Sequence, residues 1–361
     1  MIKVLRIALP PPTFFLRYPL ITYFSYVASY SGASLRVVDE YIELVSSSQK
    51  LKDGIEALLS DLTKGRVGGL KPYVPQQEAR NRLRSLIDAG ICSDADVASL
   101  IKCYLDKVVT RLNADEYFNE LSRSISTFSN GYINDSTYGL FSPLSILLPE
   151  SMEALRVFGA TWSRGTQIYP RHALLRERMR IGFHSLVAGL AGLWLGKLYE
   201  DPTTEVSTYI LLTGEKYVKQ AIDGHREVVT YGKAKQLSDI ALRIVSAFKI
   251  YMHGERATLV EIIEGGNRCD LIRFDIMEVK ELVEFAKLLD EDTRNKILKA
   301  IIIGDEYSNE IAYRLFVAAT NPRLRYESFY SLARKLLYSE NTVLKSKDLS
   351  IICKALEALH T

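Results

Sequence analysis

The hydrophobic pattern of the 361-residue chain begins as a mixture of alternating and helical segments. Residues 2–9 (IKVLRIAL) are β-branched and roughly alternating, which predicts a strand, and three consecutive prolines end it because proline cannot donate to a strand ladder. Residues 20–31 predict a helix. Residues 35–45 (LRVVDEYIELV) predict a second strand, or a strand interrupted by a turn. From residue 48 to 63 the apolar positions follow helical spacing.

The middle of the chain contains both the helical and the alternating hydrophobic pattern. Further helices are predicted over residues 76–89, 94–112, 114–127, 171–199 and 234–252. Strands are predicted in the segments 205–214 and 226–232, with a short helix between them. The segments 257–266 and 270–276 are typical of a strand pair joined through a turn of two glycines and an asparagine.

Past residue 277 the pattern is helical only. Five helices are predicted there, over residues 277–289, 291–303, 306–320, 323–338 and 348–359. The fold class predicted from this order is α+β: a mixed α/β body over residues 1–275, followed by a C-terminal all-α helical bundle over residues 276–361.

Composition indicates a folded protein with no membrane partner. Hydrophobic residues make up 47% of the chain and charged residues 25%. The longest apolar stretch, Phe183 to Gly196, contains a histidine and is too short to span a bilayer, and the N-terminus is not a signal peptide. We therefore expect a cytoplasmic protein. Only six glutamines beside many charged and aliphatic residues favour a thermophilic source.

Cysteine and histidine usage predicts neither a metal site nor a cofactor. The four cysteines are Cys92, Cys103, Cys269 and Cys353, and no two of them form a C-x-x-C pair. The five histidines are scattered, without zinc-ligand spacing. We interpret the cysteines as four buried thiols in a reducing compartment.

No motif of a catalytic site is present, so the chain is predicted not to be an enzyme. The only glycine-rich candidate, KGRVGGLK at residues 64–71, is not a phosphate-binding P-loop, because Pro72 follows Lys71. One alternative stays open, a metal-dependent nuclease built on His253, Asp270 and Asp275, since such enzymes hold their ions with grouped carboxylates.

Local clusters of basic residues predict nucleic-acid binding, although the net charge is only +3. Residues 64–84 and 156–180 each hold six basic residues against one acidic residue, with aromatic side chains close by. The predicted binding residues are Lys64, Arg66, Lys71, Arg80, Arg84, Arg164, Arg171 and Arg176. The alternatives are a solvated loop for the first cluster and ion pairs with another domain for the second. A third window, 216–256, is weaker and favours a solvated helix face.

The beginning IKVLRIALPPP and the helical segment NEIAYRLFVAATNPRLRYESFYSLARKLLY, residues 309–338, carry a family resemblance. In size and element order the chain resembles the large subunit of archaeal type I-A CRISPR surveillance complexes (Cascade), which act in antiviral defence. The resemblance implies a subunit without catalytic residues. It would help recognise the short motif beside a DNA target, hold the opened R-loop, and contact guide RNA, target DNA and the other effector subunits, including the helicase and nuclease.

The sequence therefore leads to one hypothesis and two competitors. The leading hypothesis is a nucleic-acid-binding scaffold subunit of a ribonucleoprotein. The competitors are the nuclease described above and a protein-binding adaptor with no affinity for nucleic acid.

Overall fold

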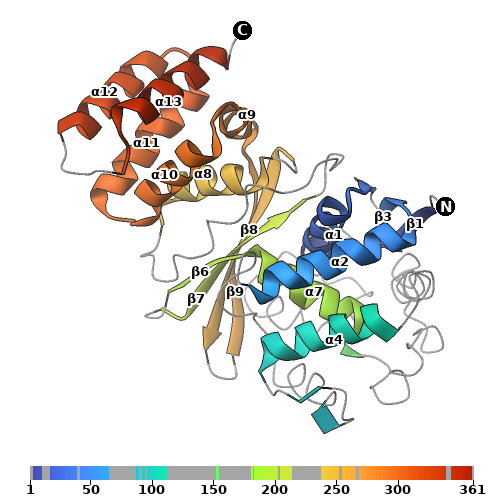
Figure 1. The fold of residues 1–361 in the computed structure, drawn as a ribbon. Coiled ribbons are helices and arrows are strands. Elements are labelled where there is room, and N and C mark those ends of the chain that lie inside the picture. Colours follow the sequence, from blue (N-terminus) through green and yellow to red (C-terminus); the bar gives the residue numbers. More distant parts are fainter. Residues whose placement is uncertain are drawn as a thin grey trace, which may run out of the picture.

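The structure is a computed structural model, and it describes most but not all of the chain. The described residues are 3–9, 17–38, 41–64, 87–88, 92–93, 96–111, 152–153, 180–181, 183–201, 204–213, 237–251, 254–265, 268–338 and 343–359. Over these ranges the protein has the predicted α+β fold, with antiparallel sheets and, at its C-terminal end, helices alone (Figure 1). The predicted helix at 114–127 and the predicted strand at 226–232 lie outside them.

Three short strands form an antiparallel sheet near the N-terminus, in the order β1-β3-β2. Their bounds are Lys3–Ala8 for β1, Ser34–Val37 for β2 and Tyr41–Ser46 for β3. Strand β1 confirms the strand predicted at residues 2–9. The second predicted strand is a hairpin, because β2 and β3 pair with each other and the Val38 N–H donates to the Tyr41 carbonyl at 2.9 Å across the turn.

Helix α1 (Arg17–Ser31) is buried on all sides rather than along one stripe. Every residue from Arg17 to Ser29 is buried. The sequence accounts for this, since beyond Arg17 the helix carries only aromatic, aliphatic, proline and small hydroxyl residues, which is typical of a helix inside a core. It packs against helices α2 (Ser48–Thr63) and α7 (Phe183–Gly196) and against the second sheet.

Glycine brings α7 into direct contact with the backbone of α1. A Cβ atom built at Gly192 would overlap the carbonyl group of Pro19. One turn along α1, the Thr22 hydroxyl donates to the Tyr18 carbonyl at 2.8 Å and accepts the Leu212 N–H at 3.0 Å. Helix α1 is therefore fixed to α7 by close packing and to the neighbouring strand by a buried hydrogen bond.

The second sheet has four antiparallel strands, in the order β6-β7-β8-β9. Their bounds are Lys197–Asp201, Val206–Leu212, Arg256–Gly265 and Arg268–Glu278. The predicted strand pair after residue 257 is confirmed as the β8–β9 hairpin. In β7 every residue after Val206 is buried, because α1 and α7 pack against this strand and α8 (Asp239–Ile250) contacts both β7 and β8.

The long helix predicted over residues 171–199 is wrong in its described part. Residues 180–181 form strand β5, which pairs with β4 (Met152–Glu153), and the helix runs only from Phe183 to Gly196. Residues 197–201 then form β6, because Tyr199 and its neighbours hydrogen-bond to β7. Pairing with another strand, β4 for residues 180–181 and β7 for residues 197–201, overrides the helical periodicity of this segment.

The C-terminal helices form a bundle, as predicted (Figure 1). They are α9 (Lys280–Leu288), α10 (Glu291–Ile302), α11 (Glu306–Thr320), α12 (Arg325–Tyr338) and α13 (Ser346–Ala358). Asp290 and Asp305 cap α10 and α11, each accepting a backbone N–H at 2.7 Å. Helix α8 precedes residue 276 yet contacts α9, α10 and α11. The boundary between residues 275 and 276 stays a prediction.

No helix in the described ranges combines the length and the apolar character needed to cross a bilayer.

A buried lysine ties α8 to the end of α7. Lys249 is only 5% exposed, and its ammonium group donates to the carbonyls of Leu195 and Gly196 at 3.2 and 3.0 Å. The last carbonyls of a helix have no partner within the helix, so Lys249 satisfies two of them from outside. Burial lowers the pKa of Lys249 to about 7, because the charged form is desolvated.

Replacing Gly192 with alanine is expected to lower the free energy of unfolding by about 1–3 kcal/mol, the usual cost of overpacking a core. The added methyl group must displace the backbone of α1 rather than a flexible side chain. Urea unfolding measures the change. Gly254→Ala is the matched control, since its Cβ would meet nothing within 4 Å. Equal stability of both variants and the parent would contradict the close α1–α7 packing.

The free energy of unfolding is expected to increase between about pH 7 and about pH 10.5, because the pKa of Lys249 is lower in the folded chain than in the unfolded chain. In this window the unfolded chain keeps the proton that the folded chain has lost, so deprotonation favours folding; below pH 7 both states are protonated and this contribution is constant. Urea unfolding at pH 7, 8 and 9 measures the slope. Lys249→Met should remove the contribution of Lys249 to the slope of the free energy of unfolding against pH. Lys280→Met, which alters an exposed lysine, should leave the slope unchanged. An unchanged slope in Lys249→Met would contradict the assignment.

Candidate nucleic-acid interface

One of the eight predicted binding residues, Lys64, lies within the described part of the chain. The other seven lie outside it: Arg66, Lys71, Arg80, Arg84, Arg164, Arg171 and Arg176. The candidate interface is therefore built here around Lys64.

Lys64 ends helix α2 as its C-cap residue, and its side chain is exposed. Its N–H donates to the Ser60 carbonyl at 3.0 Å, which closes the last turn. At the other end of α2, the Ser47 side chain accepts the Lys50 N–H at 3.3 Å. Both ends of α2 are thus fixed by local hydrogen bonds. Lys64 lies at the end of the helix, and the glycine-rich segment follows it directly in the sequence.

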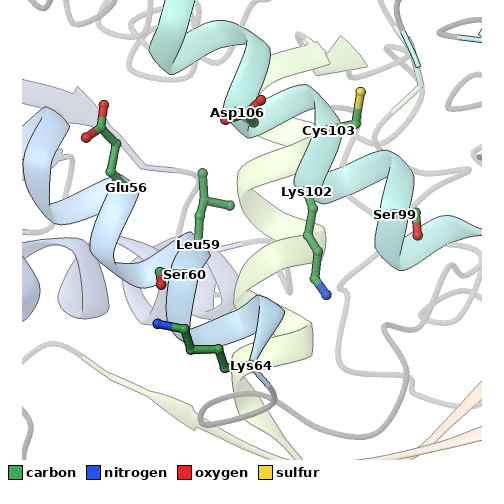
Figure 2. Close-up of a pocket in the computed structure, with 8 residues that line it drawn as sticks. All are labelled: Glu56, Leu59, Ser60, Lys64, Ser99, Lys102, Cys103 and Asp106. Carbon is green, nitrogen blue, oxygen red and sulfur yellow. The ribbon is translucent and has the colours of Figure 1, made fainter. Parts of the chain in front are cut away.

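A groove lies between α2 and α4 (Val97–Arg111), with a cavity volume of about 540 Å³. Its lining residues are Glu56, Leu59, Ser60 and Lys64 on the α2 side, and Ser99, Lys102, Cys103 and Asp106 on α4. Figure 2 shows Glu56 and Asp106 in the upper part of the view, Lys64 below Ser60 on the α2 side, and Lys102 between Lys64 and Ser99. The groove is therefore acidic at one end and basic at the other, with hydroxyl groups toward the basic end.

Lys102 reaches from α4 toward α7. Its ammonium nitrogen lies 5.2 Å from the ring centroid of Trp194, which is buried. A cation over the face of an indole ring is attracted by the negative face of the ring, so this contact orients Lys102 within the groove. Sequence reasoning did not single out Lys102, because only the packing of α4 beside α2 and α7 brings it near Lys64.

The interpretation of all four cysteines as buried thiols is wrong: Cys92 and Cys103 form a disulfide with each other, the free thiol Cys353 is only half-buried, and the side chain of Cys269 is not described. Cys103 lies on α4 and lines the groove, so the bond fastens the chain just before α4 to the middle of that helix. The sequence did not reveal the pair, because two cysteines eleven residues apart come together only when the chain turns back along the helix. The bond does not decide the compartment, since intracellular proteins of hyperthermophiles also contain disulfides.

Of the described cations in the third basic window, 216–256, Lys249 is internal, whereas Arg243 and Arg256 lie at the surface. Lys249 is buried, as shown above. Arg256 forms an ion pair with Glu278 at 2.9 Å, and an Arg243 guanidinium nitrogen lies 3.5 Å from the Glu278 carbonyl oxygen. These contacts join α8, β8 and the end of β9. The predicted solvated face is therefore wrong for Lys249, while Arg243 and Arg256 bind Glu278 at the surface.

The basic residues of α11 and α12 divide into two groups. Arg314 and Lys335 both lie within ion-pair distance of Glu310, and the buried Arg325 donates from Nε to the Ala318 carbonyl at 3.0 Å. In contrast, the side chains of Arg323 and Arg334 are exposed.

The alternative nuclease site gains no support from the side chains that are described. Asp275 forms an ion pair with Arg273 at 2.6 Å, and the same guanidinium group binds Asp239 at 2.7 Å. The structure does not describe His253 or the side chain of Asp270. Within the part of the chain that it describes, no group of three or more histidine, cysteine, aspartate or glutamate side chains is placed to hold a metal ion.

Comparison of the sequence with models of known protein families and with curated proteins found no match.

The Cys92–Cys103 bond is expected to link two tryptic peptides, because trypsin cleaves after Lys102 and separates the two cysteines. The peptides are residues 85–102 and 103–107. Mass spectrometry without reductant should find them joined, and reduction should release them. Cys103→Ser should abolish the joined species and lower the free energy of unfolding by up to about 3 kcal/mol. Two unlinked peptides from protein purified under air would contradict the bond.

Proposed function

We propose that this protein is a non-catalytic, nucleic-acid-binding scaffold subunit of a CRISPR effector ribonucleoprotein. In this role it assists recognition of the short motif beside the DNA target and helps hold the opened R-loop. Its partners would be guide RNA, target DNA and the other effector subunits, including the helicase and nuclease that carry out cleavage.

The observation that carries the proposal is the exposed Lys64 at the basic end of the α2–α4 groove. Phosphate groups are held first by lysine and arginine side chains that are exposed to solvent. Lys64 meets that requirement, and Lys102 adds a second ammonium group to the same groove.

The polarity of the groove supports a directed contact with a polyanion. Glu56 and Asp106 near the opposite end repel phosphates, so a nucleic-acid backbone is favoured only toward Lys64. In sequence, Lys64 is followed directly by Gly65, Arg66 and further basic residues up to residue 84. The basic end of the groove is thus adjacent in the chain to one of the two basic segments named above.

The modest net charge fits a subunit that shares its ligand with others. A charge of +3 over 361 residues provides a local contact rather than a fully enclosed binding channel. In an RNA-guided complex, base pairing reads the target sequence and the proteins contribute contacts to the backbone and the adjacent motif. A groove with a basic end is consistent with such a local contact.

Lys64→Glu is expected to weaken binding of the chain to a fluorescently labelled DNA duplex by roughly tenfold or more at 50 mM salt, the loss of one charge-assisted contact. It should also reduce the slope of log affinity against log salt by about one. Lys50→Glu makes the same charge change at the other, exposed end of α2 and should have little effect. Fluorescence anisotropy at 50–200 mM salt measures both quantities.

Two results would contradict the proposal. Equal effects of Lys64→Glu and Lys50→Glu on binding would show that only the overall charge of the protein matters. The groove would then have no part in nucleic-acid binding. No binding of the unaltered chain to duplex DNA, single-stranded DNA or RNA at 50 mM salt would favour a protein-binding adaptor instead.

A further inference from the structure

Helix α12 carries the three most exposed large hydrophobic side chains of the described residues. Tyr326 is 65% exposed, Tyr330 69% and Leu337 62%. At about 100° of rotation per residue, positions spaced i, i+4 and i+11 fall within about 40° of one another around the helix. The two tyrosines and the leucine therefore share one face of α12, which we call the α12 outer face.

This face cannot be buried by a small rotation of the helix, because the opposite face is anchored. Ser328, Leu332 and Leu336 are buried in the bundle, and so is Arg325, whose guanidinium group donates to the end of α11. Lys335 is also turned toward α11, where it pairs with Glu310. The exposure of the tyrosines is thus a consequence of how α12 is fixed.

Exposed arginines flank the tyrosines. Arg323 lies in the turn before α12 and Arg334 lies one turn beyond Tyr330, and the side chains of both are exposed. Glu327 is the only acidic residue between them. The order along this side is therefore arginine, tyrosine, tyrosine, arginine, with Leu337 following at its end.

We propose that the α12 outer face binds single-stranded nucleic acid, with bases stacked on Tyr326 and Tyr330 and phosphates held by Arg323 and Arg334. This inference rests on the proposed function and names a second contact surface for it. Single strands are bound without strong sequence preference when aromatic rings offer stacking platforms beside cationic side chains. The two tyrosines are separated by about 6 Å along the helix axis, close to two nucleotide steps of about 3.4 Å.

The arrangement favours nucleic acid over a partner helix. Ala333 and Leu337 continue the side of α12 that carries the tyrosines, but the exposed Arg323 and Arg334 border the two rings, and a cationic border suits a phosphate backbone better than an apolar partner helix. Three charged residues near the tyrosines in sequence are exposed, Arg323, Glu327 and Arg334, and two of the three are cationic. Figure 1 places α12 at the outer end of the bundle, on the opposite side of the molecule from α4. The two surfaces can therefore be altered separately.

The test uses the full chain and a labelled single-stranded oligonucleotide of mixed sequence, followed by fluorescence anisotropy. The double variant Tyr326→Ala/Tyr330→Ala should bind at least tenfold more weakly, since stacking of one base contributes roughly a fivefold to hundredfold gain in affinity. Tyr326→Phe/Tyr330→Phe should bind like the parent, because phenylalanine also stacks. Tyr313→Ala is the matched control, removing an exposed tyrosine from α11.

Salt dependence separates the roles of the two residue types. Arg323→Gln/Arg334→Gln should reduce the slope of log affinity against log salt by about 0.7 for each arginine, while the tyrosine double variant should leave the slope unchanged. Circular dichroism and urea unfolding should show the parent fold in every variant, since all the altered side chains are exposed.

The outcomes distinguish this inference from the proposed function. If the unaltered chain binds the oligonucleotide and the tyrosine double variant binds it equally well, the α12 assignment is wrong and the proposed function stands. A loss shared by the phenylalanine double variant, or a loss as large for Tyr313→Ala, would also overturn stacking at this face. If the unaltered chain binds no nucleic acid at 50 mM salt, the proposed function fails and this inference fails with it.

Discussion

The contact of α7 with α1 at Gly192 is the constraint on which the rest of the structure depends. A helix buried on all sides can be stable only if neighbouring elements approach it closely, and here a side chain at residue 192 would collide with the backbone of α1. That approach places α7 so that its end meets β6 and the Lys249 ammonium. The same α1 accepts the Leu212 N–H through Thr22, which fixes β7 in the middle of the four-stranded sheet. The position of the sheet, and of the helices on its other side, follows from this packing.

Burial divides the cations of the chain into structural and accessible ones. Lys249 and Arg325 donate to carbonyls at the ends of α7 and α11, where each satisfies groups that the helix itself leaves unpaired. Lys64 and Arg334 lie on surface positions. Charge counted along the sequence treats these residues alike, although only the exposed group can contact a phosphate without losing a buried hydrogen bond.

Two surfaces of different chemistry lie at opposite sides of the molecule (Figure 1). The α2–α4 groove combines ammonium and hydroxyl groups, which suit phosphates, with two carboxylates, which repel them. The outer face of α12 combines aromatic rings with guanidinium groups, which suits unpaired bases and their backbone. A scaffold subunit beside an R-loop would meet both a duplex and a displaced strand, and these surfaces would separate the two tasks.

The sequence by itself determined several of the elements, because local periodicity reports which side of a helix or strand faces the core. It predicted β1, the β8–β9 hairpin and the C-terminal helices, which are confirmed, and from local charge density it predicted Lys64 as a binding residue, which stays a prediction. The tertiary structure alone decided that residues 197–201 form a strand, since their hydrogen-bond partners in β7 follow later in the chain. It also decided that Cys92 bonds to Cys103, that Lys102 faces the groove, and that Tyr326 and Tyr330 stay exposed. These features depend on which elements pack together, and neither spacing nor composition encodes the partner of a side chain across the fold.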